Sequence, residues 1–376
     1  MPLTELDQLR LREALALAEQ AFGRSEPNPR VGCVIGHADG RVLAVGSTQA
    51  PGSAHAEAHA LQAAQAAGVD VRGATAWVTL EPCAHHGRTP PCADALVAAG
   101  LARVVVGTRD PFPQVDGRGL ERLRAAGIAV ELAEGELEQA CREINIGFLS
   151  RVQRGRPWVR MKAAASLDGR TALPNGASQW ITGEAARADG HAWRRRAGAV
   201  LTGIGTVLAD DPRLDVRLVP TPRQPLRVLA DTRLRTPPTA RVLAPPGAVL
   251  VYTAAHGASD AAHTARAQAL RAAGAQLVSL AVGHGHLLLE PMLHDLGTRG
   301  VNELHVEAGP TLNGALLREG LVDELLVYLA PLMLGEGRGM AELGTLTQLA
   351  DAPRWALHDL RRLGEDVRLR LRRPER

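Results

Sequence analysis

Short apolar runs alternate with alanine-rich stretches along the first third of the chain. The apolar runs have the length of buried strands, and they lie at Val31 to Ile35, Ala76 to Thr79 and Arg103 to Gly107. The stretches between them favour helices, at Glu57 to Ala67 and Ala93 to Ala99. Met1 to Phe22 mixes acidic residues with leucine and alanine, which is typical of an amphipathic helix. This pattern predicts an α/β sandwich.

A second alternation begins after the arginine-rich stretch that runs from Arg151 to Arg156 and ends at Pro157. Strands are predicted near Trp158 to Ala163, Val200 to Leu201, Arg227 to Ala230, Val249 to Tyr252, Leu304 to Glu307 and Glu324 to Leu329. The proline-rich segments Pro220 to Pro225 and Pro237 to Pro246 are interpreted as surface turns, because strands resume after each. We therefore expect one domain at residues 1–150 and a second at 156–376, both of the α/β class.

Composition supports a folded protein of two domains and restricts its partners. A chain of 376 residues exceeds what one core usually fills, and 45% hydrophobic with 22% charged residues is typical of globular proteins. The net charge of +3 without a long basic run argues against nucleic acid as the main partner. No segment has the apolar length of a membrane span, and the N-terminus lacks a signal peptide's apolar core. Four cysteines without an export signal indicate the cytoplasm.

One histidine and two cysteines form a candidate zinc site. His55 leads into a predicted helix, Cys83 follows the strand ending at Leu80-Glu81-Pro82, and Cys92 opens another helix, so all three are placed at helix beginnings. The positive end of a helix dipole favours thiolate over thiol, and thiolate is the zinc ligand. Three protein ligands leave one tetrahedral position for water, as in hydrolytic zinc sites.

Glu57, two residues after His55, is the candidate proton shuttle for hydrolytic deamination. Two alternatives remain open: a helix-start histidine with buried thiols, or a structural zinc completed by His85 or His86. The cysteines are separated by the eight residues Ala84 to Pro91, where deaminases commonly have two, and the insert is expected to form a loop at the pocket.

The segment from Glu81 to Cys92 closely resembles the bifunctional riboflavin-biosynthesis family. In that family a diaminohydroxyphosphoribosylaminopyrimidine deaminase is fused to a 5-amino-6-(5-phosphoribosylamino)uracil reductase. Further matches cover nearly the whole chain, at Pro27 to Gly32, Asp110-Pro111, Gly117 to Gly119, Ser166 to Arg170, Ser178 to Thr182, Thr206 to Pro212 and Glu307 to Thr311. The resemblance implies a cytidine-deaminase-like α/β/α sandwich followed by a dihydrofolate-reductase-like α/β domain. It also implies one zinc, NADPH, a pyrimidine ribonucleotide substrate, and a dimer or tetramer joined through the reductase domains.

The second half contains a weak cofactor signal of its own. Gly203-Ile204-Gly205-Thr206 follows a strand, but the third glycine of a Rossmann fingerprint would fall on Leu208, so that reading fails. The small residues after the strand at Leu304 to Glu307 precede a helix predicted from Ala315, where phosphate could approach the backbone. With the resemblance, the cofactor-binding positions become Ala164, Trp180, Thr206, Asp210, Thr232, Gly309, Pro310, Thr311, Leu312, Asn313 and Gly314.

Asp210 and Asp211 precede Pro212, so we expect them in an extended or turn conformation that can project into a cleft. By resemblance Asp210 is the catalytic carboxylate near the reacting ribose carbon and the nicotinamide. Lys162 is the only lysine in the chain, which indicates either a site that needs a compact ammonium donor or chance retention at a surface. The substrate-binding positions implied by the resemblance are Asn28, Lys162, Ser178, Arg194, Leu214, Arg217 and Glu307, with Arg194 and Arg217 suited to a 5′-phosphate.

These features support one leading hypothesis and two alternatives. The leading one combines deamination and NADPH-dependent reduction of a ribosylaminopyrimidine 5′-phosphate. The second keeps only a deaminase for a nucleotide or a tRNA base, with a non-catalytic C-terminal binding domain. The third makes the zinc structural and the protein an interaction module, and it predicts a fourth protein ligand.

Overall fold

A computed structural model describes residues 3–85, 90–244, 246–255 and 260–374. The chain forms two compact units, residues 1–155 and 156–376, and each is described by itself. Among the described residues, no helix combines the length and the apolar character needed to cross a bilayer. Both units are α/β, in agreement with the class predicted from the sequence.

The first unit is built on a five-stranded sheet in the order β2-β1-β3-β4-β5. Its strands are β1 (Gly32–Gly36), β2 (Val42–Ser47), β3 (Thr75–Val78), β4 (Arg103–Val106) and β5 (Ala129–Leu132). β1 runs antiparallel to β2 and β3, whereas β3, β4 and β5 are parallel. The carboxyl ends of β3 and β4 therefore lie at the same edge, where the loops that begin after Val78 and Val106 emerge.

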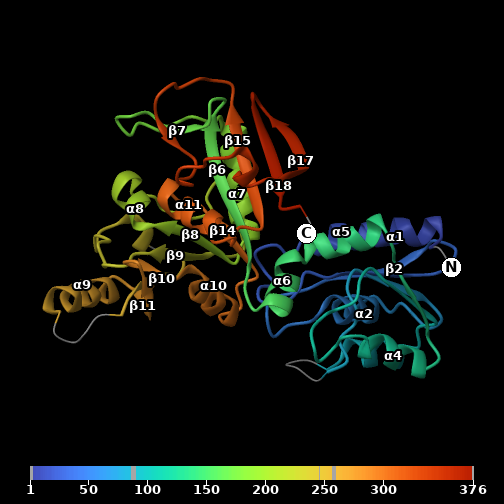
Figure 1. Cartoon of the computed structure of the whole chain (residues 1–376). Coiled ribbons are helices and arrows are strands. Elements are labelled where there is room, and N and C mark those ends of the chain that lie inside the picture. Colours follow the sequence, from blue (N-terminus) through green and yellow to red (C-terminus); the bar gives the residue numbers. More distant parts are fainter. Residues whose placement is uncertain (1–2, 86–89, 245, 256–259, 375–376) are drawn as a thin grey trace. The chain divides into compact units, whose positions relative to one another are not determined.

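Helices cover both faces of this sheet (Figure 1). They are α1 (Glu5–Glu19), α2 (Ala56–Ala66), α3 (Cys92–Ala98), α4 (Arg118–Ala125), α5 (Glu136–Ile144) and α6 (Ile146–Arg154). Alternate strand residues face opposite layers: Val34, Trp77 and Val105 pack under α1, while their neighbours pack under α2, α3 and α4. Because α6 extends to Arg154, the arginine-rich stretch is mainly helix and not an extended linker.

A buried carboxylate fastens α1 to the sheet. Asp7 is 1% exposed, and it accepts hydrogen bonds from Trp77 Nε1 at 2.7 Å and from both terminal nitrogens of Arg103 at 2.6 and 3.0 Å. It also closes a capping box with Thr4 at the start of α1. Burial alone raises the pKa of Asp7, but Arg103, Thr4 and Trp77 bring it well below its usual value.

We expect Asp7→Asn to lower the free energy of unfolding of the first unit by about 3 kcal/mol, because it breaks a buried ion pair. The matched control is Asp70→Asn, which breaks an exposed pair with Arg72 and should leave the free energy of unfolding nearly unchanged, because solvent screens that pair. Denaturant melts that follow the unfolding of the first unit measure both. Since the folded-state pKa of Asp7 is depressed, its contribution is complete above the ordinary aspartate pKa of about 4. The difference between wild type and variant should therefore shrink as the pH falls below that value; a difference that is independent of pH would contradict this account.

The second unit is built on a nine-stranded sheet in the order β11-β10-β9-β8-β14-β6-β15-β18-β17. Its strands are β6 (Trp158–Ser166), β8 (Ala199–Gly203), β9 (Leu226–Ala230), β10 (Val249–Ala254), β11 (Ala275–Leu280), β14 (Glu303–Val306), β15 (Glu324–Ala330), β17 (Ala356–Leu363) and β18 (Asp366–Arg372). Neighbouring strands are parallel through the first seven positions of this sheet order, from the edge strand β11 across to β15. The last two strands are antiparallel to their neighbours, since β18 pairs with β15 and β17 pairs with β18. Small ribbons pair β7 (Arg170–Ala172) with β16 (Arg338–Gly339), and β12 (Val282–Gly283) with β13 (His286–Leu287).

The helices that cover the two faces of this sheet are α7 (Glu184–Arg196), α8 (Ile204–Asp210), α9 (Ala261–Ala272), α10 (Leu289–Thr298) and α11 (Pro310–Arg318). Single 3-10 turns lie at Arg241–Leu243 and Leu349–Asp351. Core side chains of α10 and α11 pack on one face with Val159, Leu201 and Leu304. Those of α8 and α9 pack on the other face with Val200 and Leu229. Helix α7 lies over β15 through Trp193, Leu326 and Tyr328.

Two local predictions in this unit were wrong. The helix predicted from Ala315 begins at Pro310 with Gly309 as its N-cap, since proline at the first helical position needs no N–H partner. Asp210 is not extended, because it is the last residue of α8. Asp211 instead takes the left-handed conformation that ends the helix before Pro212, with φ 39°.

Candidate functional site

The first unit brings His55, Cys83 and Cys92 together at the carboxyl edge of its sheet. His55 is the N-cap of α2, and Cys92 is the first residue of α3. Cys83 does not begin a helix, contrary to the prediction, because it lies in the loop after β3. The sulfur of Cys83 nevertheless lies at the N-terminus of α3, because the Cys92 N–H donates to Cys83 Sγ at 3.3 Å.

The three ligand atoms have the spacing that zinc requires. His55 Nδ1 lies 3.7 Å from Cys83 Sγ and 3.4 Å from Cys92 Sγ, and all three atoms are within 4.8 Å of one another. Tetrahedral zinc at about 2.3 Å from sulfur and about 2.0 Å from nitrogen needs ligand atoms roughly 3.5 Å apart. Hydrogen bonds from Cys92 and His55 lower the pKa of Cys83, despite its burial. The residues therefore fit a zinc ion with one histidine and two thiolates.

Glu57 lies beside this set on the first turn of α2. Its side chain is buried, and its carboxylate is within hydrogen-bonding reach of Cys92. Burial, reinforced by the charge of Cys83, raises the pKa of Glu57 to about 7. A carboxylate in this position can gain and lose a proton near neutral pH.

The arrangement bears on the alternative of a structural zinc. Among the described residues, His55, Cys83 and Cys92 form the group that could hold a metal, and His85 is not part of it. The ring of His85 instead faces Phe112, with centroids 5.8 Å apart. His86, the other candidate fourth ligand, lies outside the described residues, as do residues 87–89 of the insert. Asn28 lies in the turn before β1, where its N–H donates to the Ser25 carbonyl oxygen.

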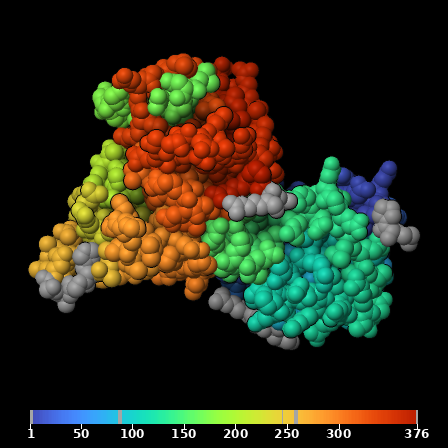
Figure 2. Space-filling model, in the orientation of Figure 1, coloured from blue at the N-terminus to red at the C-terminus, as the bar shows by residue number. Residues whose placement is uncertain are grey.

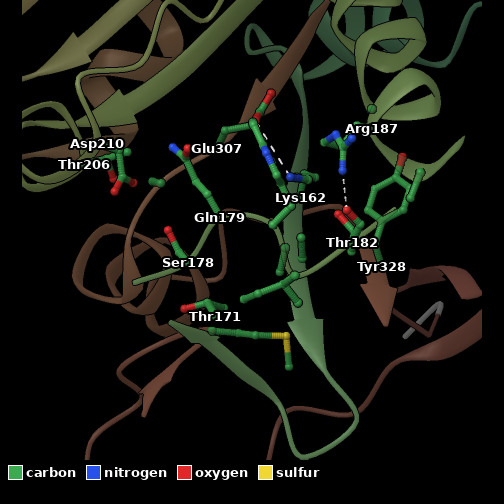
Figure 3. A pocket seen from close by; sticks show the side chains of 18 of the residues that line it. Lys162, Thr171, Ser178, Gln179, Thr182, Arg187, Thr206, Asp210, Glu307 and Tyr328 are labelled. Carbon is green, nitrogen blue, oxygen red and sulfur yellow. Dashed lines mark hydrogen bonds and ion pairs between the residues drawn. The ribbon is translucent and has the colours of Figure 1, made fainter. Parts of the chain in front are cut away.

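In the second unit, a cavity of about 750 Å³ opens at the carboxyl ends of β6, β14 and β15. Lys162, on β6, and Glu307, just after β14, lie on the side of the sheet that α7 covers (Figure 3). Pairing with neighbouring charges offsets the free energy needed to remove these two charged groups from water. Lys162 Nζ is 4.0 Å from Glu307 Oε2, and Arg194 of α7 binds both oxygens of Glu307.

Electrostatics in this cavity centre on Glu307. Burial alone raises the pKa of Glu307, but Arg194, His305 and Lys162 hold it well below its usual range. Burial lowers the pKa of Lys162, and the negative charge of Glu307 opposes that shift. Arg194 also donates to the Asp215 carbonyl oxygen at 2.9 Å, so its donors are largely used within the protein. The prediction that Arg194 reaches a 5′-phosphate is therefore less favoured by geometry than its role as the partner of Glu307.

Arg217 lies at the mouth of the same cavity and is nearly half exposed. Its guanidinium pairs with Asp215 at 2.7 Å, and its backbone N–H donates to His191 Nδ1 at 3.1 Å. Burial, with Arg194 and Arg217 nearby, lowers the pKa of His191 to about 4, so this ring is neutral near pH 7 and accepts that bond. The guanidinium of Arg217 is therefore partly open to solvent at this cavity, although it already pairs with Asp215.

Thr206 and Asp210 line the opposite wall of the cavity (Figure 3). They are four residues apart in α8, so both side chains lie on one face of that helix. Ser178, Trp180 and Ala164 complete the predicted lining. Figure 2 shows the segment around β7, in light green, at the surface of this unit. It lies among orange and red C-terminal segments, and one of these, β16, pairs with β7.

A second cavity of about 830 Å³ adjoins the first, and Thr206, Gly309 and Pro310 line both. It extends along the N-terminus of α11 past Thr311 and Leu312 to Thr232 at the end of β9. The N-cap of α11 is Gly309, which has no side chain to accept hydrogen bonds. The first N–H groups of this helix, which have no acceptor within the helix, therefore lie at the cavity. Four of the basic residues that line its walls were not predicted from the sequence: Arg233 and Arg235, which follow β9, and His284 and His286 in the β12–β13 ribbon.

Two of the positions predicted in the second unit line neither cavity. The side chain of Leu214 is 2% exposed and packs in the core under α8 and α9. Gly314 lies against the loop at Glu342, where a Cβ would overlap the carbonyl oxygen, so the residue permits close packing of α11. Asn313 holds the same loop by donating to the Met340 carbonyl oxygen at 2.9 Å.

Sequence reasoning missed several residues that line the first cavity, among them Thr171, Gln179, Arg187 and Tyr328. Tyr328 pairs with Ala164 in the β15–β6 register, and its hydroxyl donates to Asp189 at 2.6 Å. Its apolar surroundings in the sequence resemble any buried strand. The strand order alone shows that it borders the site.

Comparisons with known proteins agree with this division. Residues 4–108 match the family described as the cytidine and deoxycytidylate deaminase zinc-binding region, and residues 157–369 match the RibD C-terminal domain. The riboflavin biosynthesis protein RibD of Escherichia coli (strain K12) is 44% identical over 97% of this chain and 99% of its own length.

Two solved structures are similar over nearly their full length. The Acinetobacter baumannii RibD, form 1, has a TM-score of 0.86 at 41% identity and covers 99% of both chains. A diaminohydroxyphosphoribosylaminopyrimidine deaminase/5-amino-6-(5-phosphoribosylamino)uracil reductase of Thermotoga maritima has a TM-score of 0.85 at 33% identity, covering 98% of this chain and 99% of that one.

Proposed function

Since this chain belongs to the RibD family of bifunctional riboflavin biosynthesis enzymes, we propose that its first unit deaminates a pyrimidine nucleotide through His55, Cys83, Cys92 and Glu57 and that its second unit reduces the product. The substrate we assign is 2,5-diamino-6-ribosylamino-4(3H)-pyrimidinone 5′-phosphate, and the final product is 5-amino-6-ribitylamino-uracil 5′-phosphate. The observation that carries the proposal is the convergence of one histidine, two cysteines and a buried glutamate in one unit of a chain whose other unit has a large cavity with a partly buried lysine.

In the deaminase unit, His55, Cys83 and Cys92 would hold the zinc. A bound zinc supplies a Lewis acid that makes water a better nucleophile near neutral pH. Glu57 takes a proton from the attacking water and gives it to the departing ammonia, and its burial keeps competing solvent away from that proton. The ring carbon thereby exchanges its amino group for oxygen, and one water is consumed for each ammonia released.

In the reductase unit, reduction adds hydride to C1′ of the ribosyl group, breaks its bond to the ring oxygen and needs one proton for that oxygen. NADPH supplies the hydride when bound. Lys162 is the proposed proton and hydrogen-bond donor, held in the cavity by Glu307. Asp210, with Thr206, which lines both cavities, orients the ribose against the cofactor. Arg217 is the proposed partner of the 5′-phosphate.

The second cavity is the proposed NADPH site. A volume of about 830 Å³ suits a cofactor-sized ligand, and the N-terminus of α11 offers N–H groups to its diphosphate. Arg233 and Arg235 follow Thr232 at the far end, with His284 and His286 opposite in the β12–β13 ribbon. This concentration of donors supports a further phosphate there, and hence NADPH in place of NADH.

The cytoplasm is the proposed compartment, because the four cysteines are free and two of them serve as metal ligands. A homo-oligomer joined through the reductase units is the proposed assembly. The alternative in which the C-terminal half is a non-catalytic binding module is set aside, since residues 157–369 match the reductase family.

Zinc removal separates the two activities. After treatment with a chelator, we expect ammonia release from the diaminopyrimidine nucleotide to fall to background, while oxidation of NADPH with the deaminated nucleotide continues at the untreated rate. Zinc added back should restore ammonia release, and NADH should support far slower reduction than NADPH at equal concentration. Ammonia release that survives complete zinc removal would contradict the deaminase assignment. Reduction that stops with the zinc would contradict the assignment of two separate sites.

A further inference from the structure

A second buried carboxylate lies two residues before Cys83 and takes no part in the proposed chemistry. Glu81 is 3% exposed, and its Oε2 accepts the N–H groups of Asp110 at 3.3 Å and Gly117 at 3.1 Å. Its Oε1 accepts those of Gly119 at 3.0 Å and Leu120 at 3.4 Å. Four backbone donors from one distant segment thus converge on a single side chain.

Three of these donors, the N–H groups of Gly117, Gly119 and Leu120, belong to the N-terminus of α4, and the fourth, of Asp110, lies in the loop after β4. The N-cap of this helix is Gly117, in the left-handed conformation with φ 86°, and it offers no side chain to the free N–H groups of the first turn. Glu81 supplies the missing acceptor from another part of the chain, and its negative charge lies at the positive end of the helix dipole. Gly119 permits the approach, because a Cβ there would overlap the carbonyl oxygen of Pro82.

Helix α4 in turn contacts both cysteine segments. Arg122 donates to the carbonyl oxygen of Ala84, the residue after Cys83, at 3.2 Å. The same guanidinium pairs at 2.5 Å with Asp94, two residues after Cys92. The N-terminus of α4 is therefore bound by Glu81, which lies just before Cys83. One turn further along the helix, Arg122 binds a residue that follows each cysteine.

We infer that Glu81 is a positioning residue for the metal: by capping α4, it fixes the separation of Cys83 and Cys92 and so slows the loss of zinc. This inference rests on the proposed zinc site. The cysteine segments also bond to each other, through the N–H groups of Cys92 and Ala93 to the sulfur and carbonyl oxygen of Cys83. Those bonds hold the two residues adjacent, whereas α4 braces both from outside.

The test measures zinc release from the full-length holoenzyme to a chromogenic chelator. In Glu81→Gln, an NH2 group replaces one carboxylate oxygen and faces backbone N–H groups that need an acceptor. We therefore expect zinc to be released about tenfold faster or more. Glu81→Asp, which keeps the carboxylate, should recover part of the loss. Glu121→Gln, the same change at an exposed position in the first turn of α4, should release zinc at the wild-type rate.

A second variant keeps the inference open to refutation if Glu81→Gln does not fold. Arg122→Gln removes a partly exposed side chain that does not belong to the core, and it should also speed zinc release, by a smaller factor. Wild-type release from both variants, or a lowered melting temperature with unchanged release, would overturn the positioning role. Absence of zinc from the wild-type enzyme would instead overturn the proposed deaminase site, so the two failures are distinguishable.

Discussion

Replacing Glu57 by glutamine is expected to lower the rate of ammonia release by about 10²- to 10⁴-fold, the usual contribution of a general acid–base group. Glutamine has nearly the same size and can still accept a hydrogen bond from Cys92, but it cannot carry a proton between water and ammonia. Zinc content, measured by metal analysis, should remain one per chain. NADPH oxidation with the deaminated nucleotide should be unchanged, because that step belongs to the other unit.

The matched control for this variant is Glu136→Gln, the same change at an exposed position in the first turn of α5. It should leave ammonia release at the wild-type rate. Full activity in Glu57→Gln would refute the proton-shuttle role. Loss of zinc along with activity would show instead that the carboxylate serves to retain the metal.

Replacing Asp210 by asparagine is expected to lower kcat for NADPH oxidation by about 10²-fold, the loss that a misplaced reactant can cause. Asparagine keeps the shape of the side chain but loses the charge that Asp210 presents to the cavity wall beside Thr206. KM for NADPH should change little, because the proposed diphosphate site at α11 is untouched. Ammonia release should stay at the wild-type rate. Steady-state assays with each half-reaction's own substrate measure these effects separately.

Asp211→Asn provides the neighbouring control. The Asp211 carboxylate accepts the Arg241 N–H at 2.8 Å, and asparagine retains that acceptor and tolerates the left-handed backbone. Its reductase rate should match the wild type. If Asp210→Asn were equally active, the orienting role would be withdrawn, and Lys162 with Glu307 would have to carry the chemistry of this cavity without it.

Several features of the protein could be predicted from local sequence because their physical causes are local. Apolar runs such as Val249 to Tyr252 predicted strands within a few residues of their observed ends, since a strand buried on both faces needs an uninterrupted apolar run. The helices predicted at Glu57 to Ala67 and Ala93 to Ala99 lie within one residue of α2 and α3. The start of α11 was missed because Pro310 was read as part of a loop, although proline is favoured at a first helical position.

The candidate metal ligands were recognisable for a similar reason. His55 and Glu57 lie in one short segment, and Cys83 and Cys92 lie in another, so the residue types and their spacing carry the chemical pattern. The sequence did not reveal that Glu81 caps a helix whose N-terminus lies 36 residues away in the chain. The residues around Glu81 in the sequence do not show whether its carboxylate is buried and accepts backbone hydrogen bonds or lies in a solvated turn.

By itself, then, the sequence determined the α/β class, the positions of the nine predicted strands and the set of residues able to hold zinc, because hydrophobic periodicity and short-range spacing depend on neighbours in the chain. Only the tertiary structure decided that Lys162, Arg194 and Glu307 share one cavity, and that Leu214 is core. Their meeting depends on β14 lying between β8 and β6 and on α7 crossing the sheet above them. Strand order is set by the packing of segments far apart in the chain, and no local pattern of residues encodes it.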